Sequence, residues 1–307
     1  MTSAEEFAAA ARTHLSQPLA DRWIELLRPA IEFPYPDPDE PVEPERVALR
    51  RGGDPLLPDD VDWPTVEGYG PLMFMADMDC AAVAAAGGVE LLPTEGSLLF
   101  FYGGHPDRFP ERWMGRDSQR WTAWEQGRVI YLPPGLERKP RRQPQEPDPD
   151  DWLDPIEPQD SRAVLISTPP SAASELIEHN FGNGVKAQYD SHWAAVLQAG
   201  GPATLPPGAE FELWDSDFES AVNDDWGYCY TGGYAHPCQR PVELETAVAA
   251  LGDGTKMSDE RAIEEAGHWR LLFQDGWEAG DMILYWMIRE DDLAAGRFDR
   301  VWFGQQR

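Results

Sequence analysis

The feature that most constrains this fold is a theme that occurs twice, a Gly-Gly turn followed by two short apolar stretches. The turns are Gly52-Gly53 and Gly232-Gly233. The apolar stretches that follow them are residues 71–79 and 96–102 in the first copy, and residues 271–275 and 282–288 in the second. Short runs that are rich in aromatic residues and bounded by glycine favour strands covered on both faces over helices. The alternative is that such turns and strands recur by chance in a β-rich chain.

This repetition predicts an α+β fold, with a mainly antiparallel, sheet-rich core built from two related halves, peripheral helices and long Pro-rich loops. Phe74 and Leu272 are expected to occupy equivalent surroundings in the two halves. The chain has 307 residues, enough for one large domain or two fused ones. The expected segments are an N-terminal part at 1–46, half one at 47–136, a Pro-rich loop at 137–161, a middle strand and helices at 162–225, and half two at 226–307.

The N-terminal part is expected to contain two helical pieces and a linker. Ser3 and Glu6 form a capping box, and Pro18 interrupts the apolar spacing that follows. Residues 33–46 alternate proline with acidic residues and predict an extended linker. Asp79 is expected to cap a short alanine-rich helix. Further expected elements are a buried strand at 163–167 and helices at 172–178, 191–199, 216–222, 243–251 and 259–266.

The formal net charge of −30 restricts the kinds of partner. Binding a phosphate backbone requires clustered Lys and Arg, so no nucleic acid is expected as a partner. The charge would steer a cationic partner toward the protein, although an acidic surface that serves solubility is the alternative. No apolar run approaches the ~20 residues of a membrane helix, and no membrane partner is expected. Glu5 and Glu6 stand where a secretory signal carries Lys or Arg, which predicts a cytoplasmic protein.

The sequence carries no recognisable catalytic or metal-binding motif. The three cysteines, Cys80, Cys229 and Cys238, are an odd number, which favours reduced, buried thiols over disulfides. His236 lies close to Cys238, but a structural zinc site needs four ligands, so no metal and no cofactor are expected. The motifs GxSxG, HExxH and GxxxxGK are absent. No catalytic residue is therefore assigned.

The candidate binding site consists of polar residues at the ends of the repeated strands. If the halves pack about a pseudo-twofold axis, these residues should converge in a cleft that tryptophans line. Carboxylates beside aromatic rings can bind a cation, a sugar or a basic peptide. The alternative is that the acids cap turns and remain solvated. The candidates are Trp63, Asp77, Asp79, His236, Gln239, Gln274, Asp275, Glu278, Asp281 and Trp286.

Five segments of the chain carry a resemblance to a known family. They are GGDPLLPDDVDWP at 52–64, PLMFMADMD at 71–79, LPTEGSLLFFYG at 92–103, GGYAHPCQRP at 232–241, and the stretch from LLFQ to DRVWF at 271–303. In this order they resemble the YwqG-like family of uncharacterised bacterial proteins. Two departures are Ala76-Asp77, where the family shows Ala-Gln, and a shortened acidic insert at 275–278. The resemblance implies a sheet-rich α+β fold with two similar halves and no established catalytic residues.

The leading functional hypothesis is a non-enzymatic, cytoplasmic protein-binding factor that captures a basic protein with an acidic surface. Some members of the resembling family lie beside toxin genes, which implies an immunity-type or partner-recognition role. One alternative is an enzyme or small-ligand-binding protein that uses the acidic, Trp-lined cleft between the halves. Another is a subunit of an oligomeric scaffold.

Overall fold

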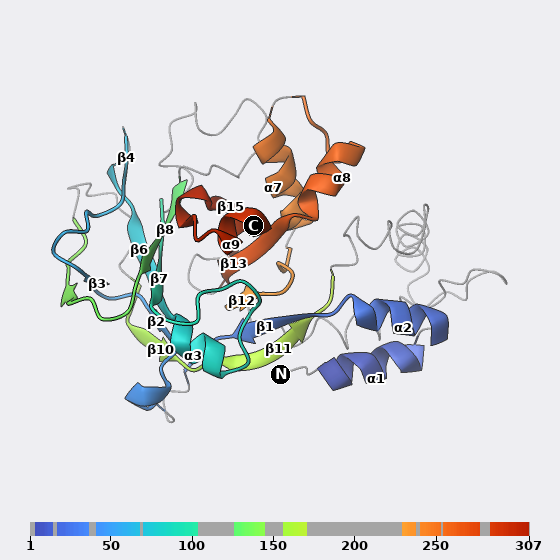
Figure 1. Ribbon diagram of the computed structural model, residues 1–307, viewed down its shortest axis with the longest axis horizontal. Helices are drawn as coiled ribbons and strands as arrows, with labels where there is room; N and C mark the ends of the chain where they lie inside the picture. The colour runs from blue at the N-terminus through green and yellow to red at the C-terminus, as the bar shows by residue number, and fades with distance from the viewer. Residues whose placement is uncertain are drawn as a thin grey trace, which may run out of the picture.

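Two antiparallel sheets face each other in the structure, a computed structural model (Figure 1). The structure describes residues 4–14, 17–36, 41–67, 70–103, 126–144, 156–170, 229–237, 240–252, 254–276 and 283–306. The predicted α+β class, with mainly antiparallel sheets and peripheral helices, is confirmed. The helices expected at 172–178, 191–199 and 216–222 lie outside the described residues.

The larger sheet has six strands and the smaller has five. In spatial order the six are β11 (Val164–Thr168), β1 (Arg28–Glu32), β12 (Tyr230–Gly232), β13 (Trp269–Asp275), β14 (Ile283–Arg289) and β15 (Trp302–Gln306). The five are β10 (Gln159–Ser161), β2 (Leu49–Arg51), β6 (Met73–Asp79), β7 (Ser97–Tyr102) and β8 (Gly127–Leu132). Two small ribbons pair β3 (Leu56–Leu57) with β9 (Lys139–Pro140), and β4 (Thr65–Val66) with β5 (Gly70–Pro71).

The described helices lie around these sheets. They are α1 (Ala4–His14), α2 (Gln17–Glu25), α3 (Cys80–Ala85), α7 (Val242–Leu251), α8 (Glu260–Ala266) and α9 (Glu290–Ala294), with 3-10 turns η1 (Pro44–Arg46) and η4 (Phe298–Arg300). Asp79 caps α3 as predicted, accepting a hydrogen bond from the backbone N–H of Ala82 at 2.9 Å. Within the described part of the chain, no helix has the length and apolar character needed to cross a bilayer.

The N-terminal part differs from the prediction in one respect, because it supplies a strand of the core. The two predicted helical pieces are α1 and α2, which pack through an edge contact between Phe7 and Trp23 at 6.2 Å. Strand β1 then pairs with both β11 and β12 inside the larger sheet. Its sequence, RPAIE, mixes charged residues and proline with two apolar ones, so it lacks the alternation that signals a strand.

The two halves share strand order and register. The order β10-β2-β6-β7-β8 in one sheet matches β1-β12-β13-β14-β15 in the other. The hairpin β6–β7 has an irregularity between Phe74 and Ala76, and β13–β14 has one between Leu271 and Phe273. The turns at Gly52 and Gly232 both have left-handed backbones, with φ of 64° and 77°. The prediction of two related halves is therefore confirmed.

The bulge changes which residues correspond. Counting from the irregularity, Leu272 is equivalent to Met75, and both lie in the interior between the sheets. Phe74 instead lies in the outer cluster of the smaller sheet, with Leu57 and Leu99. The expected match of Phe74 with Leu272 is thus wrong by one residue, because each bulge turns two consecutive residues toward the interior.

Aromatic side chains from both halves fill the space between the sheets. The ring centroids of Phe100 and Phe273 lie 4.5 Å apart, and those of Phe100 and Trp286 lie 5.6 Å apart. The indole Nε1 of Trp286 donates to the backbone oxygen of Phe101 at 3.2 Å, so the polar atom of this buried ring has a partner in the opposite half. The two sheets therefore enclose a single packed interior, and α7 covers the outer face of the larger one (Figure 1).

Replacing Gly52 by alanine is expected to destabilise the protein more than replacing Gly135. Both have left-handed backbones, with φ of +64° and +82°, where a Cβ costs about 1–2 kcal/mol. A Cβ at Gly52 would also lie 2.1 Å from the backbone oxygen of Ile156, whereas one at Gly135 would meet nothing within 4 Å. The clash should add about 1–3 kcal/mol to the loss in unfolding free energy, measured by urea denaturation. Equal losses for the two variants would contradict the close packing at the first turn.

Candidate functional site

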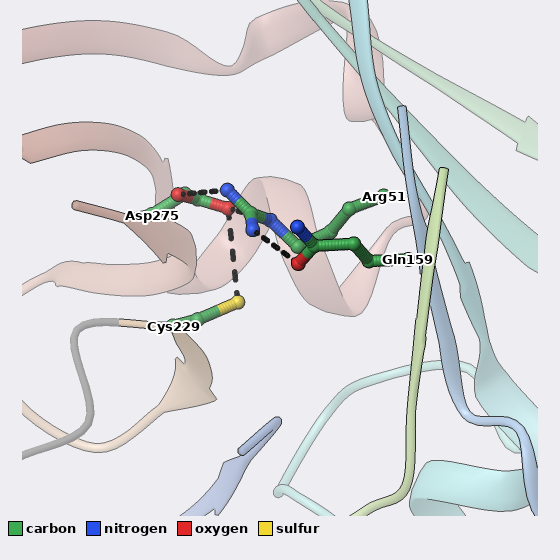
Figure 2. A network of polar contacts seen from close by, with 4 residues as sticks. All are labelled: Arg51, Gln159, Cys229 and Asp275. Carbon is green, nitrogen blue, oxygen red and sulfur yellow. Dashed lines mark hydrogen bonds and ion pairs between the residues drawn. The ribbon is translucent and has the colours of Figure 1, made fainter. Parts of the chain in front are cut away.

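A buried ion pair joins the two halves across the interior. Arg51 lies on β2 of the smaller sheet and Asp275 at the end of β13 in the larger one. The guanidinium binds the carboxylate through two bonds, Nε to Oδ2 at 2.6 Å and Nη2 to Oδ1 at 2.8 Å (Figure 2). Each side chain is 1% exposed. Such a two-pronged arrangement is the strongest geometry for an arginine–carboxylate pair and fixes the orientation of both groups.

Three further side chains complete the surroundings of this pair. Nη1 of Arg51 donates to Oε1 of Gln159 at 3.3 Å, and the thiol of Cys229 donates to Oδ2 of Asp275 at 3.8 Å (Figure 2). The ring of Tyr35 lies 5.6 Å from the guanidinium carbon of Arg51. The network therefore draws on both sheets and on the segment that follows β1.

Burial and the neighbouring charges determine the protonation states of Arg51 and Cys229. Burial is the largest single effect and disfavours the charged form of Arg51. The charge and hydrogen bond of Asp275, together with Cys229 and Tyr35, outweigh burial and raise the pKa of Arg51. Burial, followed by the same carboxylate, raises the pKa of the Cys229 thiol well above its usual range. Because a thiolate is the reactive form of cysteine, Cys229 is an inert donor here. The network therefore has no net charge, and it links the two halves through the Arg51–Asp275 ion pair.

Strand alternation explains why these residues face inward. On β2, Leu49 and Arg51 are buried while Arg50 between them is exposed. On β13, Phe273 faces the interior, so Asp275 two residues later faces it as well. The equivalent of Arg51 in the second half is Thr231, which donates to the backbone oxygen of Leu272 at 2.6 Å. The ion pair is therefore a feature that breaks the symmetry of the two halves.

The same alternation separates Asp77 from Gln274, which are equivalent residues of the two halves. The residues that precede them, Ala76 and Phe273, both face the shared interior, so Asp77 and Gln274 face outward on opposite sides of the molecule. Asp77 accepts from Nη1 of Arg138 at 3.3 Å. Its pKa is raised by burial, which the charge of Arg138 partly offsets. The described strand-end residues do not converge in one cleft, because packed aromatic rings fill the space between the halves.

Gln274 and His236 belong to a second polar group, on the outer face of the larger sheet. Oε1 of Gln274 accepts from the backbone N–H of His236 at 2.9 Å, and the hydroxyl of Tyr285 donates to the backbone oxygen of His236 at 2.7 Å. Burial lowers the pKa of His236 to about 4, so its imidazole is neutral at pH 7. These bonds hold the turn after β12 against β13 and β14.

The remaining predicted residues have separate roles. Asp79 caps α3, and Trp286 is fully buried in the shared interior. Trp63 is partly buried, donates from Nε1 to the backbone oxygen of Leu72 at 2.8 Å, and lies edge-on to Phe101. Gln239, Glu278 and Asp281 lie outside the described residues.

Asp275 is the one predicted site residue, among those that the structure describes, that belongs to the polar network around Arg51. Sequence reasoning missed Arg51 and Gln159, and treated Cys229 as a structural thiol, which its burial confirms. The inward position of Arg51 could have been predicted from the sequence. Side chains alternate between the two faces of a strand, so Arg51 lies on the same face as the apolar Leu49, and Arg50 lies on the other. Nothing local in the sequence pairs Arg51 with a carboxylate 224 residues away.

Trp63 ends a stretch that we call the acidic loop, residues 58–63. Arg141 donates to the backbone oxygens of Pro58, at 3.0 Å, and of Val61. Lys139 binds the carboxylate of Asp59 at 2.6 Å. These bonds hold the acidic loop from one side.

Two carboxylates of the acidic loop point away from this anchorage. Asp60 and Asp62 are exposed, and neither makes an ion pair or a side-chain hydrogen bond with any residue that the structure describes. The neighbouring cations are already engaged, Lys139 by Asp59 and Arg138 by Asp77. The loop therefore presents to solvent, on an anchored backbone, two negative charges that no described residue compensates.

Comparison with known proteins places this fold in a family. No curated protein matches the chain. A family model described as "Domain of unknown function (DUF1963)" matches residues 50–306, which include both Gly-Gly turns, the hairpins β6–β7 and β13–β14, and the Arg51–Asp275 pair. The chain therefore belongs to the DUF1963 domain family.

Proposed function

We propose that this protein is a non-enzymatic partner-recognition factor that captures a basic protein through the acidic loop. The observation that carries the proposal is the fixed backbone of this loop, anchored by Arg141 and Lys139, with Asp60 and Asp62 left exposed. A loop that is already ordered loses little conformational entropy on binding, so more of the interaction energy remains as affinity.

The overall charge supports the same role. The chain has 55 acidic against 25 basic residues, so the long-range field attracts cations. Such a field raises the association rate and falls with ionic strength, since charges farther apart than about 8 Å are largely screened at physiological salt. The acidic loop would add local specificity to this general attraction. Trp63 at its end is partly exposed and offers an aromatic contact beside the two carboxylates.

The test compares two variants that lose the same charge, one in the acidic loop and one on α8. Asp60→Asn with Asp62→Asn removes the exposed acids of the loop, and Glu260→Gln with Glu264→Gln removes two exposed acids from α8. Proteins captured from native lysate at low and moderate salt would be identified by mass spectrometry, and their affinities for the purified chains measured. The loop variant is expected to weaken binding by about 2- to 30-fold, at 0.2–1 kcal/mol for each exposed charge pair, and the α8 variant to change it by less than about twofold.

Two results would count against partner recognition by the acidic loop. One is the capture of no protein at either salt concentration. The other is an equal loss of affinity in the loop and α8 variants, which would assign the binding to net charge alone. Light scattering on the purified chain tests the separate hypothesis of an oligomeric scaffold.

We further propose that the protein is one of the YwqG-like bacterial proteins and acts in the cytoplasm, in an immunity-type role against a basic target. The five segments that carry the resemblance lie within or overlap the family match at 50–306. The acidic loop is part of the first of them, at 52–64. The alternative of a Trp-lined cleft between the halves has less support, because Trp286 is buried among Phe100 and Phe273.

A further inference from the structure

A cavity lies where the chain crosses twice between the two sheets. Residues 33–36 follow β1 of the larger sheet, residues 41–48 lead into β2 of the smaller one, and residues 162–163 join β10 to β11 (Figure 1). The two crossings are adjacent, because the backbone N–H of Ala48 donates to the backbone oxygen of Ser161 at 2.8 Å. The cavity between them has a volume of about 250 Å³.

The lining of this crossover cavity is positively charged, in contrast to the chain as a whole. Arg46 and Arg162 contribute two guanidinium groups, and Glu43 one carboxylate. Both arginines are exposed, and among the residues that the structure describes neither forms an ion pair or a side-chain hydrogen bond. Among the residues that line the cavity, two arginines thus stand against one carboxylate, in a chain whose net charge is −30. No described residue therefore competes with an anion from solution for these two guanidinium groups.

The rest of the lining is apolar or aromatic. It includes Pro34, Val42 and the ring of Tyr35. Tyr35 also lies 5.6 Å from the guanidinium carbon of Arg51, so the cavity wall rests on the buried inter-half ion pair. Its prolines and this anchored ring give the cavity a preformed shape, as ligand sites commonly have.

The volume sets the size of the ligand. A cavity of roughly 150 Å³ is known to hold benzene. The crossover cavity, at about 250 Å³, has room for a single ring and one further polar group. The planar, forked guanidinium matches both carboxylate and phosphate oxygens.

We propose that the crossover cavity binds a small organic anion. Arg46 and Arg162 hold its carboxylate or phosphate group, and Pro34, Val42 and Tyr35 contact a body the size of one ring. This site is separate from the acidic loop and attracts ligands of the opposite charge, so its existence does not depend on the proposed partner recognition.

Isothermal titration of the full chain tests the proposal with four probes: phenyl phosphate, benzoate, inorganic phosphate and phenol. At least one of the two aromatic anions is expected to bind at a single site, and phenol and inorganic phosphate at least about tenfold more weakly. Arg46→Gln with Arg162→Gln should weaken that binding by about tenfold or more, because charged hydrogen bonds to the anion are lost. Arg12→Gln with Arg142→Gln, which removes two exposed arginines elsewhere, should change it by less than about twofold.

A third variant, Val42→Phe, keeps both arginines and fills the cavity, and it should also weaken binding of the aromatic anion. The proposal is overturned if neither aromatic anion binds, or if the Arg46/Arg162 variant binds as tightly as the native chain. If inorganic phosphate binds as tightly as phenyl phosphate, the apolar wall does not contribute to affinity. If phenol binds as tightly as the aromatic anions, the arginines do not contribute. Circular dichroism of each variant verifies that the fold is retained.

Discussion

Replacing Asp275 by asparagine is expected to lower the free energy of unfolding by about 3–5 kcal/mol. The substitution leaves the guanidinium of Arg51 charged, 1% exposed and without its carboxylate. An uncompensated buried charge costs far more than the favourable interaction of an exposed pair, which is about 0–1 kcal/mol. Equilibrium denaturation in urea, followed by tryptophan fluorescence, measures the loss.

The double variant Arg51→Met with Asp275→Leu separates the cost of the orphaned charge from the value of the pair. Apolar residues of similar volume remove both charges together, and such replacements of buried pairs are often neutral or stabilising by about 1–4 kcal/mol. The double variant should therefore be clearly more stable than Asp275→Asn. As a control, Asp160→Asn removes the exposed partner of Arg50 and should cost less than about 1 kcal/mol. Equal losses for Asp275→Asn and Asp160→Asn would contradict the buried network.

Replacing Trp286 by alanine is expected to cost about 3–5 kcal/mol, because the ring fills the interior between the sheets. Trp286 is fully buried and contacts Phe100 of one half and Phe303 of the other at centroid distances of 5.6 and 5.0 Å. Its loss would leave a cavity and remove the hydrogen bond to the backbone oxygen of Phe101. Chemical denaturation monitored by circular dichroism gives the difference.

The matched control is Trp302→Ala. Trp302 is partly exposed and lies edge-on to Trp269 on the outer side of the larger sheet. Its removal should cost less than half as much, because solvent can fill the space that it leaves. If both variants lose the same stability, Trp286 is not the central contact between the halves.

Much of the fold followed from local pattern. The apolar runs that became β6, β7, β13 and β14 stand out because glycines bound them and both of their faces are covered. The helix predicted at 243–251 is α7, and the strand predicted at 163–167 is β11, each within one residue. The expectation that this strand is buried is wrong, because β11 is the edge strand of the larger sheet and Leu165 is 52% exposed. Strand β1 was missed because RPAIE gains its stability from two neighbouring strands rather than from its own pattern. The loop expected at 137–161 likewise contains β9 and β10 at its two ends.

The site was less predictable, for a reason that the bulges make clear. Whether a polar residue faces the interior or solvent changes with a single inserted residue, and neither bulge is marked in the sequence. Asp275 and Gln274 are neighbours, yet Asp275 is paired with Arg51 between the halves, whereas Gln274 lies on the outer face of the larger sheet and accepts from His236. Contacts such as Arg51–Asp275 and Arg141–Pro58 join residues that are distant in the chain, and no local pattern specifies them. The acids of the acidic loop stand together in the sequence as DDVD, but the bonds from Arg141 and Lys139 that hold the loop join residues about 80 positions apart.

These features divide the molecule into an interior that holds the halves together and two surface features that are available to other molecules. In the interior, the charges of Arg51 and Asp275 neutralise each other. The acidic loop and the crossover cavity leave their charges exposed, with opposite sign. The proposals for both depend on the halves forming one rigid unit, because that unit fixes the loop and the cavity wall.

Amide hydrogen exchange in the native chain and in Asp275→Asn tests this unity most directly. In one cooperative unit, the slowest amides of β6–β7 and of β13–β14 open only with global unfolding and have the same exchange free energy. We predict equal values in the two hairpins of the native chain and an equal drop in both, of about 3–5 kcal/mol, in Asp275→Asn. A drop confined to β13–β14, with β6–β7 protected as before, would contradict the shared interior on which the account depends.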